Sequence, residues 1–445
     1  MNPHHYDLHR AMRTRREAAL RRGVIAVLDI GSSKVSCLVL QGEMEPDGSA
    51  DPVQLKTGGP GSYRVVGASN TRSRGVSFGE ITSMEECERA LRTAIQGAQT
   101  AANLRFDHVL VSFSGGRPRS YGVSGEAFVS GGAVGDMDIG HVLGACDLPD
   151  FGQDRDILHA LPVNYCLDTR TGLTDPRGQI GRELAVDMHV VTVGGASLRN
   201  LMHCLRRCDL ELAGIVSAPY ASALASLTDD EQELGAACID IGANTTGISI
   251  FVRRKKIYAD CVRLGGHHVT RDISQGLQVS LQDAERLKTK LGGLIATSLD
   301  DRDMIDLPPV LGEWESHRRQ ISRSELIGVM RPRVEEILED VRERLDASGF
   351  EYLPSQRIVL TGGSSQIPGL ETIASHILGR QCRLGRPIRI RGLPQSVSGA
   401  AFSAPVGLAM HISYAEEECW DFELPADRQG ARKVARALRW FKENW

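Results

Sequence analysis

The sequence lacks the features that would direct it across a membrane, into an oxidising compartment or onto nucleic acid. It has no apolar stretch long enough to span a bilayer and no signal-peptide pattern. Its formal net charge of −4 gives no bulk electrostatic reason to expect a nucleic-acid partner. None of its ten cysteines belongs to a CxxC pair, so the sequence indicates reduced thiols in a cytosol rather than a disulfide framework or a metal site.

What the sequence does contain is a repeated strand–turn–strand segment. It reads LDIGSSKVSCLV in the first half of the chain and IDIGANTTGISI in the second. Each copy starts with an apolar strand, Val24–Ile30 or Ala236–Ile241, that ends in an aspartate and a glycine turn rich in hydroxyls and amides. Glycine lets the turn approach a ligand closely, and successive turn N–H groups can cradle phosphate oxygens. The duplication predicts two homologous half-domains that face one nucleotide.

The turns supply the candidate phosphate and metal ligands. Asp29 and Asp240 can hold a hydrated Mg²⁺ between the loops, because Mg²⁺ keeps several waters and takes few carboxylates. Lys34 adds a point charge. One such turn alone would be an ordinary hairpin, whereas two at domain-scale spacing favour a nucleotide site. The residues predicted to surround the phosphates and metal are Asp29, Gly31, Ser32, Ser33, Lys34, Asp240, Gly242, Asn244, Thr245 and Thr246.

A third segment follows the same chemistry later in the chain. Arg357–Leu360 is a short apolar strand, and the loop TGGSSQIPG leads from it to a predicted helix, Leu370–Leu378. Paired glycines let backbone lie flat against a ring or ribose. Gly362, Gly363 and Ser364 are therefore predicted to line an adenosine, although a plain strand-to-helix loop would have the same pattern.

Together the three segments resemble the actin, heat-shock-chaperone and sugar-kinase ATPase superfamily. The first two resemble its phosphate loops and the third its adenosine loop. The resemblance implies an α/β fold of duplicated, actin-like ribonuclease-H-type domains with ATP and Mg²⁺ between them. It also implies that Gly265 and Gly266 in LGGHHVT, with Glu285 and Lys288 on one helix face, hold the adenosine from the other side.

Several longer stretches resemble one family within that group, the FtsA family of bacterial division homologues of actin. They are SRGVSFGEI, PVNYCLD, VRLGGHHVTRDI and MRPRVEEIL, and the terminal RALRWFKENW is similar to that family's membrane-targeting helix. The resemblance covers about residues 23–445. It implies an ATP-binding, polymer-forming adaptor that tethers FtsZ filaments to the cytoplasmic face of the inner membrane at the division site, binds itself in filaments, and recruits late divisome membrane proteins.

One departure from the superfamily bears on catalysis. Chaperone-type members place an acid or amide before the proline of the first connecting helix, where this chain has Ser217 and Ala218. Neither can act as a general base at neutral pH. The sequence therefore predicts no catalytic residue and at most a weak ATPase.

The domain order follows from the resemblance and from the apolar periodicity. The predicted parts are a basic N-terminal tail (1–22), a first actin-like core (23–109 and 193–230), an inserted α+β subdomain (110–192), a second core (231–262 and 353–415), its helical subdomain (263–352), a linker (416–430) and an amphipathic helix (431–445). The tail is expected to be disordered, with a basic helix from Arg10 to Arg22 as the alternative. None of the Gly-rich turns of the inserted subdomain follows a strand that ends in Asp, so we expect an interaction surface there rather than part of the nucleotide site.

Two surfaces are expected to bind partners. By resemblance, the FtsZ C-terminal peptide would contact Arg323, Arg331 and Arg333 in the helical subdomain, since arginine binds carboxylates bidentately. The alternative is a solvated helix in which these arginines pair with neighbouring acids. At the C-terminus, helical spacing places an apolar stripe opposite a basic face suited to an anionic membrane surface. The stripe is Val434, Leu438, Phe441 and Trp445, and the basic face is Arg432, Arg436 and Arg439.

Two other functions share parts of this pattern. A PilM-like cytoplasmic adaptor of type IV pilus assembly would carry the same inserted module, and a sugar or acetate kinase would carry the same nucleotide loops. The basic, amphipathic C-terminal segment disfavours both.

Overall fold

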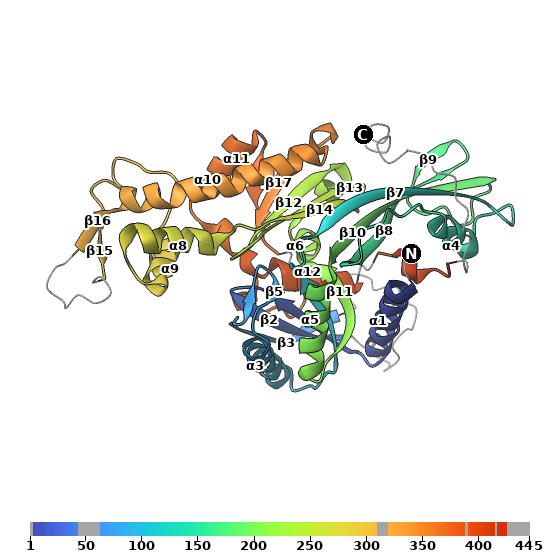
Figure 1. The fold of residues 1–445 in the computed structure, drawn as a ribbon, viewed down its shortest axis with the longest axis horizontal. Helices are drawn as coiled ribbons and strands as arrows, with labels where there is room; N and C mark the ends of the chain where they lie inside the picture. The colour runs from blue at the N-terminus through green and yellow to red at the C-terminus, as the bar shows by residue number, and fades with distance from the viewer. Residues whose placement is uncertain (1–2, 43–62, 309–318, 388–389, 414–415, 425–445) are drawn as a thin grey trace.

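Two five-stranded sheets with the same topology form the framework of the molecule (Figure 1). The computed structural model describes residues 3–42, 63–308, 319–387, 390–413 and 416–424. The first sheet has the order β3-β2-β1-β6-β11 and the second the order β14-β13-β12-β17-β18. In each sheet the first three strands are antiparallel and the last three parallel. The repeated hairpins of the sequence thus belong to a repeated fold.

The strands of both sheets are short and largely buried. Those of the first sheet are β1 (Val24–Ile30), β2 (Lys34–Gly42), β3 (Tyr63–Arg72), β6 (His108–Phe113) and β11 (Glu211–Ser217). Those of the second are β12 (Ala236–Ile241), β13 (Thr246–Val252), β14 (Lys255–Val262), β17 (Arg357–Thr361) and β18 (Cys382–Leu384).

Strand β1 shows how each sheet is covered on both faces. Ala26 and Leu28 face an outer core formed with helices α3 (Met84–Ala102) and α5 (Gly195–Arg207). Ile25 and Val27 face an inner core shared by the two sheets. A strand buried on both faces needs apolar residues throughout rather than alternation, which is why the sequence of β1 is almost continuously apolar.

Helices α6 (Ala218–Ser226) and α12 (Ser403–Ser413) lie between the two sheets. They approach closely at Gly407, where an added Cβ would lie 1.7 Å from the carbonyl oxygen of Ala221. Only glycine permits this backbone contact, so Gly407 sets how closely α6 and α12 can pack.

The second half carries a helical subdomain at one end of the molecule's long axis (Figure 1). It contains α8 (Gly266–Leu277), α9 (Leu281–Lys290), the hairpin β15 (Met304–Leu307) and β16 (Arg319–Ser322), and α10 (Arg323–Ala347). Ser322 caps α10 in a capping box with Glu325. Apolar residues of α8, α9 and α10 join α11 (Leu370–Leu378) and the outer face of the second sheet in one core.

The inserted subdomain lies at the opposite end of the long axis (Figure 1). It is an antiparallel sheet of order β7-β10-β8-β9 with helix α4 (Asp136–Gly144) packed on it. Its strands are β7 (Arg119–Phe128), β8 (Arg155–Leu167), β9 (Arg170–Leu173) and β10 (Glu183–Gly194). Ser120 of β7 also reaches the second half: its Oγ donates to Ala259 O at 2.7 Å and accepts from Ala259 N at 2.8 Å.

Short elements complete the fold. They are the hairpin β4 (Val76–Ser77) and β5 (Glu80–Ile81), helix α7 (Asp229–Leu234), and the 3₁₀ turns η1 (Phe350–Tyr352), η2 (Gly363–Gln366), η3 (Gln395–Val397), η4 (Ala400–Phe402) and η5 (Cys419–Asp421). Within the described ranges, no helix has the length and apolarity needed to cross a membrane.

The two ends of the described chain depart most from the sequence expectation. Residues 3–21 form a helix, α1 (Pro3–Arg21), where we expected a disordered tail. It forms because Met12 and Ala19 are buried against the first half, and because His9 is buried against Ile157 O and the Trp420 ring.

The predicted linker also differs. Residues 416–424, called the C-terminal strap below, are packed: Cys419, Trp420 and Phe422 are buried in the core of the inserted subdomain. Two acids of the predicted linker are also withdrawn from solvent: Glu418 is buried and Glu416 is half-buried.

Candidate functional site

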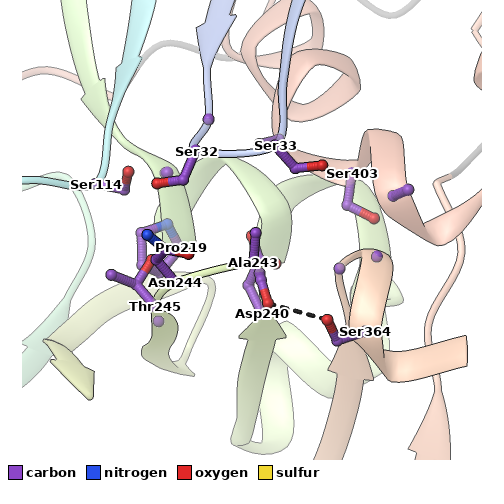
Figure 2. A pocket seen from close by; sticks show the side chains of 18 of the residues that line it. Ser32, Ser33, Ser114, Pro219, Asp240, Ala243, Asn244, Thr245, Ser364 and Ser403 are labelled. Atoms are coloured by element: carbon purple, nitrogen blue, oxygen red, sulfur yellow. Dashed lines mark hydrogen bonds between the residues drawn. The ribbon is translucent and has the colours of Figure 1, made fainter. Parts of the chain in front are cut away.

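A cavity of about 450 Å³ lies between the two halves, at the ends of β1 and β12. It is lined by the loops that follow these strands, by the start of α6, by α9, and by the η2 and η4 turns. Figure 2 shows that Ser32 and Ser33 approach from one half and Ala243, Asn244 and Thr245 from the other. A cavity of this size is in the range of small-molecule sites.

The two hairpin turns are built alike. Gly31 N donates to Lys34 O at 3.0 Å, and Gly242 N donates to Thr245 O at 2.9 Å. An added Cβ at Gly31 or Gly242 would come within 3.1 or 2.9 Å of those same carbonyls. Both turns therefore need glycine to be this tight, and both present their tips to the cavity.

The two aspartates predicted to hold the metal line the cavity, with Asp29 buried and Asp240 half-buried. Ser112 Oγ donates to Asp29 Oδ1 and Ser222 Oγ to Asp240 Oδ2, each at 2.5 Å. Burial raises the pKa of both carboxyls, to about 6 for Asp240, where the charge of Asp29 also contributes. Two carboxylates largely withdrawn from solvent, with one oxygen of each held by a serine, form a donor set that suits a hydrated divalent cation.

Lys34 lies between the halves rather than in solvent. Its Nζ lies 3.2 Å from the centroid of the Phe402 ring and donates to Ala401 O. Burial lowers the pKa of Lys34 to about 8, against the opposing charges of Asp29 and Asp240. The ammonium is thus beside the cavity and within the field of both carboxylates, where an anionic ligand would add to the charges that favour protonation.

The glycine loop after β17 closes the cavity on the second half. Gly362 has a φ of +89°, and an added Cβ there would lie 2.3 Å from Asp240 Oδ1. Gly362 is therefore required both by backbone conformation and by its contact with Asp240. Gly363 and Ser364 line the cavity beside it, and Ser364 Oγ donates to Gly242 O at 3.0 Å.

The opposite wall carries the predicted adenosine residues of α9. Glu285 and Lys288 line the cavity, with Lys288 Nζ 2.7 Å from Glu285 Oε2. Gly265 and Gly266 do not line it but lie directly behind it. An added Cβ at Gly266 would lie 2.1 Å from Ser364 Oγ, so this glycine lets α8 approach the Ser364 loop.

Two polar residues of the second turn are engaged by the protein itself. Thr246 is fully buried, and its hydroxyl donates to Leu264 O at 2.9 Å, so its side chain does not line the cavity. Asn244 does line it, but its amide donates to Ser77 Oγ at 2.8 Å and faces His267 Nδ1 at 2.7 Å. The side chain of Asn244 thus ties β4 of the first half to α8 of the second.

The sequence analysis missed one loop of the site, which lies at the start of the segment predicted to be an interaction surface. Ser114, Gly115 and Pro118 line the cavity, although residues 110–192 were expected to lie outside it. The reason is topological: β6 pairs with β1 as β17 pairs with β12, so the Ser-Gly-Gly turn after β6 is the counterpart of the Thr-Gly-Gly turn after β17. Comparing VSFSGG with VLTGGS could have revealed it. Ala401 and Ser403 of the η4–α12 turn also line the cavity and were not predicted.

The wall nearest α6 offers no general base. Ser217 and Ala218 both line the cavity, as does Pro219. Among the described residues, the acids that line it are Asp29, Asp240 and Glu285. Ser217 is held from behind, since its backbone N donates to His159 Nε2 at 3.0 Å.

The three arginines predicted to bind a peptide are paired with acids of the chain. Arg333 forms a bidentate pair with Asp272 of α8, at 2.6 and 3.1 Å, and also contacts Glu336. Arg331 pairs with Glu335, and Arg323 with Asp300. The pairing with Asp272 crosses from α10 to α8 and could not be anticipated from helical spacing. The predicted membrane residues, from Arg432 to Trp445, lie outside the described residues.

Comparisons with known proteins agree with this arrangement. A family model described as "Cell division protein FtsA" matches residues 237–407, and one described as "SHS2 domain inserted in FTSA" matches residues 115–192. Curated relatives include the "Cell division protein FtsA" of Agrobacterium fabrum, 39% identical over 96% of each chain. That of Pseudomonas aeruginosa is 32% identical over 96% of this chain and 100% of its own.

Among solved structures, the PilM–PilN type IV pilus biogenesis complex has a chain that resembles this one with a TM-score of 0.58 at 15% identity. The match covers 87% of this chain and 98% of that chain. At this identity the likeness shows a shared fold and nothing finer.

Proposed function

Since the chain belongs to the FtsA family of cell division proteins, we propose that it is a nucleotide-dependent assembly adaptor of the division machinery. In this proposal it binds ATP with Mg²⁺, assembles with copies of itself, links FtsZ filaments to the cytoplasmic face of the membrane, and recruits later division proteins. Membership of this family favours the division adaptor over the pilus adaptor and the kinase.

One observation carries the nucleotide part of the proposal: two topologically equivalent turns, each preceded by an aspartate that lines the cavity, face one another across it. In the proposed complex the turn backbones and the hydroxyls of Ser32, Ser33 and Thr245 bind the phosphates, and Lys34 leaves Phe402 to join them. Gly362, Gly363 and Ser364 support the adenosine against Glu285 and Lys288.

Asp29 and Asp240 are the residues that would hold the magnesium ion, through its waters. When bound, Mg²⁺ would neutralise part of the phosphate charge beside these two carboxylates. Ser112 and Ser222 would keep the carboxylates oriented, because each serine already donates to one oxygen of its aspartate.

Slow turnover is part of the proposal. A water that attacks the terminal phosphate would need a base beside Ser217 and Ala218, and neither residue can accept a proton at neutral pH. ATP would therefore act mainly as a ligand that fixes the relation of the two halves.

Isothermal titration calorimetry of ATP in the presence and absence of Mg²⁺ tests the nucleotide site. Asp240→Ala should abolish the Mg²⁺-dependent part of ATP binding, because it removes a ligand group that lines the cavity. Asp187→Ala, in the inserted sheet and away from the cavity, is the matched control and should bind as the unchanged protein does. Equal affinity of Asp240→Ala and the unchanged protein would refute the proposed site.

The FtsZ part of the proposal rests on the helical subdomain. Arg333 already binds a carboxylate in the bidentate geometry that a peptide terminus or acidic side chain would use. Its side chain is about 29% exposed, so an incoming carboxylate could replace Asp272.

The membrane part rests on the sequence of residues 431–445, in which apolar and basic side chains segregate at helical spacing.

A further inference from the structure

The C-terminal strap places one acid deep in the protein. Glu418 is buried between the inserted subdomain and the first half: Ala160 N donates to its Oε2 at 2.8 Å, and His159 Nδ1 lies 3.0 Å from its Oε1. Both partners belong to β8 of the inserted subdomain. A carboxylate that accepts two hydrogen bonds in a buried site is a strong local anchor, so Glu418 fixes the strap against β8.

The same histidine reaches the nucleotide cleft. His159 Nε2 accepts a hydrogen bond from Ser217 N at 3.0 Å, and Ser217 lines the cavity. Because Nε2 accepts, the ring proton sits on Nδ1 and is donated to Glu418. Burial lowers the pKa of His159 well below its ordinary value, which keeps the ring neutral, and the hydrogen bond from Ser217 N selects the tautomer. The hydrogen bonds thus run in one sense from Ser217 through His159 to Glu418.

Strand β8 touches the cleft at the adjacent position as well. Leu158 lines the cavity directly, so consecutive residues of β8 contact the cleft and the strap. A shift of β8 or of the Ser217 turn would therefore change the contacts of both the nucleotide cleft and the strap.

Helix α1 clasps the strap from its other side. The His9 ring stacks on Trp420 at 3.7 Å, Arg13 donates to Asp421 O at 2.8 Å, and Tyr6 donates to Phe422 O. The strap is thus held between α1 and β8, immediately before residues 425–445, and its attachment depends on contacts from two separate elements.

We propose that the C-terminal strap is allosterically coupled to the nucleotide cleft through the Glu418–His159–Ser217 hydrogen-bond chain. Nucleotide binding shifts the strap toward its docked position against β8 and α1, and loss of the nucleotide makes undocking more frequent. A ligand that contacts the Ser217 turn restricts its motion and keeps Ser217 N aimed at His159, so less conformational entropy is lost when the strap docks. The coupling must be reciprocal: a loosened strap lowers nucleotide affinity by the same factor. This inference rests on the proposed nucleotide site.

Hydrogen–deuterium exchange of the full chain measures the first half of the coupling. The backbone bonds from Asp421 N to Glu418 O and from Phe422 N to Cys419 O lie within the η5 turn of the strap, so their exchange reports how well ordered the strap is. A saturating non-hydrolysable ATP analogue with Mg²⁺ should slow exchange of peptides covering residues 416–424 by about fivefold or more, the lower end of typical coupling. Exchange in α3, which lines neither the cavity nor the strap, should not change.

A pair of matched substitutions on the strap measures the reciprocal effect. In Glu418→Gln one of the two carboxylate oxygens is replaced by an N–H₂ group, which cannot accept a hydrogen bond. Either Ala160 N or His159 Nδ1 then faces another donor, so at least one hydrogen bond is lost. It should weaken binding of the analogue by about fivefold or more in calorimetry. Glu423→Gln, an exposed position on the same strap, should leave the affinity unchanged.

The outcomes separate this inference from the proposed function. If the analogue does not bind the unchanged protein at all, both fail. If it binds but strap exchange stays the same, the coupling alone is refuted, whatever the variants do. Exchange in the unchanged protein needs no substitution, so poor folding of Glu418→Gln, checked by its thermal unfolding, cannot mask the result.

Discussion

Buried ionisable side chains shape the behaviour of this molecule at the scale of single residues. Lys256 is fully buried, and its Nζ lies 4.4 Å from the centroid of the Tyr220 ring. Within the described part of the chain its ammonium has no hydrogen-bond partner. Burial lowers the pKa of Lys256 to about 7, opposed by the charges of Glu418 and Glu416. The other ionisable groups coupled to it are His159, His189 and His411.

The first residue-scale prediction concerns pH. The unfolded chain keeps the Lys256 proton up to a pH of about 10.5, whereas the folded protein releases it at about 7. The unfolded state therefore binds more protons between these values, and stability rises with pH across this window. Lys256→Met should be more stable than the unchanged protein at pH 7, and the advantage should shrink toward pH 9.5 by on the order of 1 kcal/mol per pH unit.

Urea unfolding at pH 7 and pH 9.5 checks this prediction. Lys290→Met, at the exposed end of α9, is the control and should show no such pH-dependent advantage. Stability differences between Lys256→Met and the unchanged protein that are equal at the two pH values would contradict it.

The second residue-scale prediction concerns Arg333. Arg333→Glu should weaken binding of an FtsZ C-terminal peptide roughly ten- to hundredfold, because it removes a charged bidentate donor and adds a repelling acid beside Asp272. Arg342→Glu, on the opposite face of α10, should not weaken it. Fluorescence polarisation measures both, and equal affinities for the two variants would remove Arg333 from the peptide site.

At the scale of elements, the contact of α6 with α12 is the tightest in the inner core. Gly407→Ala would place a methyl 1.7 Å from Ala221 O, a clash with backbone that no side-chain rotation relieves. It should destabilise the protein by at least about 2 kcal/mol. Gly328→Ala on α10 meets nothing within 4 Å and should be neutral or stabilising by up to about 1 kcal/mol. Thermal unfolding measures the stability of both variants. Similar midpoints would show that α6 and α12 can move apart at little cost in free energy.

The elements also show which parts of the fold the sequence could reveal. Strands β1, β12 and β17 and helix α11 were predicted, because their apolar runs and the glycine turns beside them are local signals. Helix α1 and the strap were not, because each is stabilised by residues distant in sequence: α1 by the first half and by the strap, and the strap by the core of the inserted subdomain and by α1. Nothing within the strap sequence distinguishes a buried Glu418 from a solvated linker acid.

The candidate site divides in the same way. The two aspartate turns and the Thr-Gly-Gly loop are contiguous motifs and were found. The Ser114–Gly115 turn was missed because it was not compared with the Thr-Gly-Gly loop, whose place beside β12 matches the place of this turn beside β1. The hydroxyl of Thr246 looked available for a phosphate, but it is used by Leu264 across the turn. Such competition within the protein is visible only once the strands are paired.

At the scale of the whole molecule, the strap divides the C-terminal region into a structural part and a distal part. A chain that ends at Leu424 should keep its stability in urea but no longer pellet with anionic liposomes, because it lacks residues 425–445. A chain that ends at Ser413 should in addition lose several kcal/mol, since Cys419, Trp420 and Phe422 leave the inserted core and a buried large apolar side chain contributes about 1.5–3 kcal/mol. Liposome binding by the shorter chains would contradict the membrane proposal, and equal urea midpoints of the two chains would contradict the structural role of the strap.

The two bonds between Ser120 and Ala259 have a mechanical consequence. The halves of the molecule are joined where β11 runs into α6 and where α12 returns between the sheets, and two such crossings alone would leave a soft torsional mode about the line through them. The Ser120 contact is a further link, on the edge strand of the second sheet, and acts as a brace. Rotation of one half against the other must stretch or break the two Ser120–Ala259 hydrogen bonds. These bonds therefore resist such rotation, and torque applied at one end of the molecule is transmitted to the other.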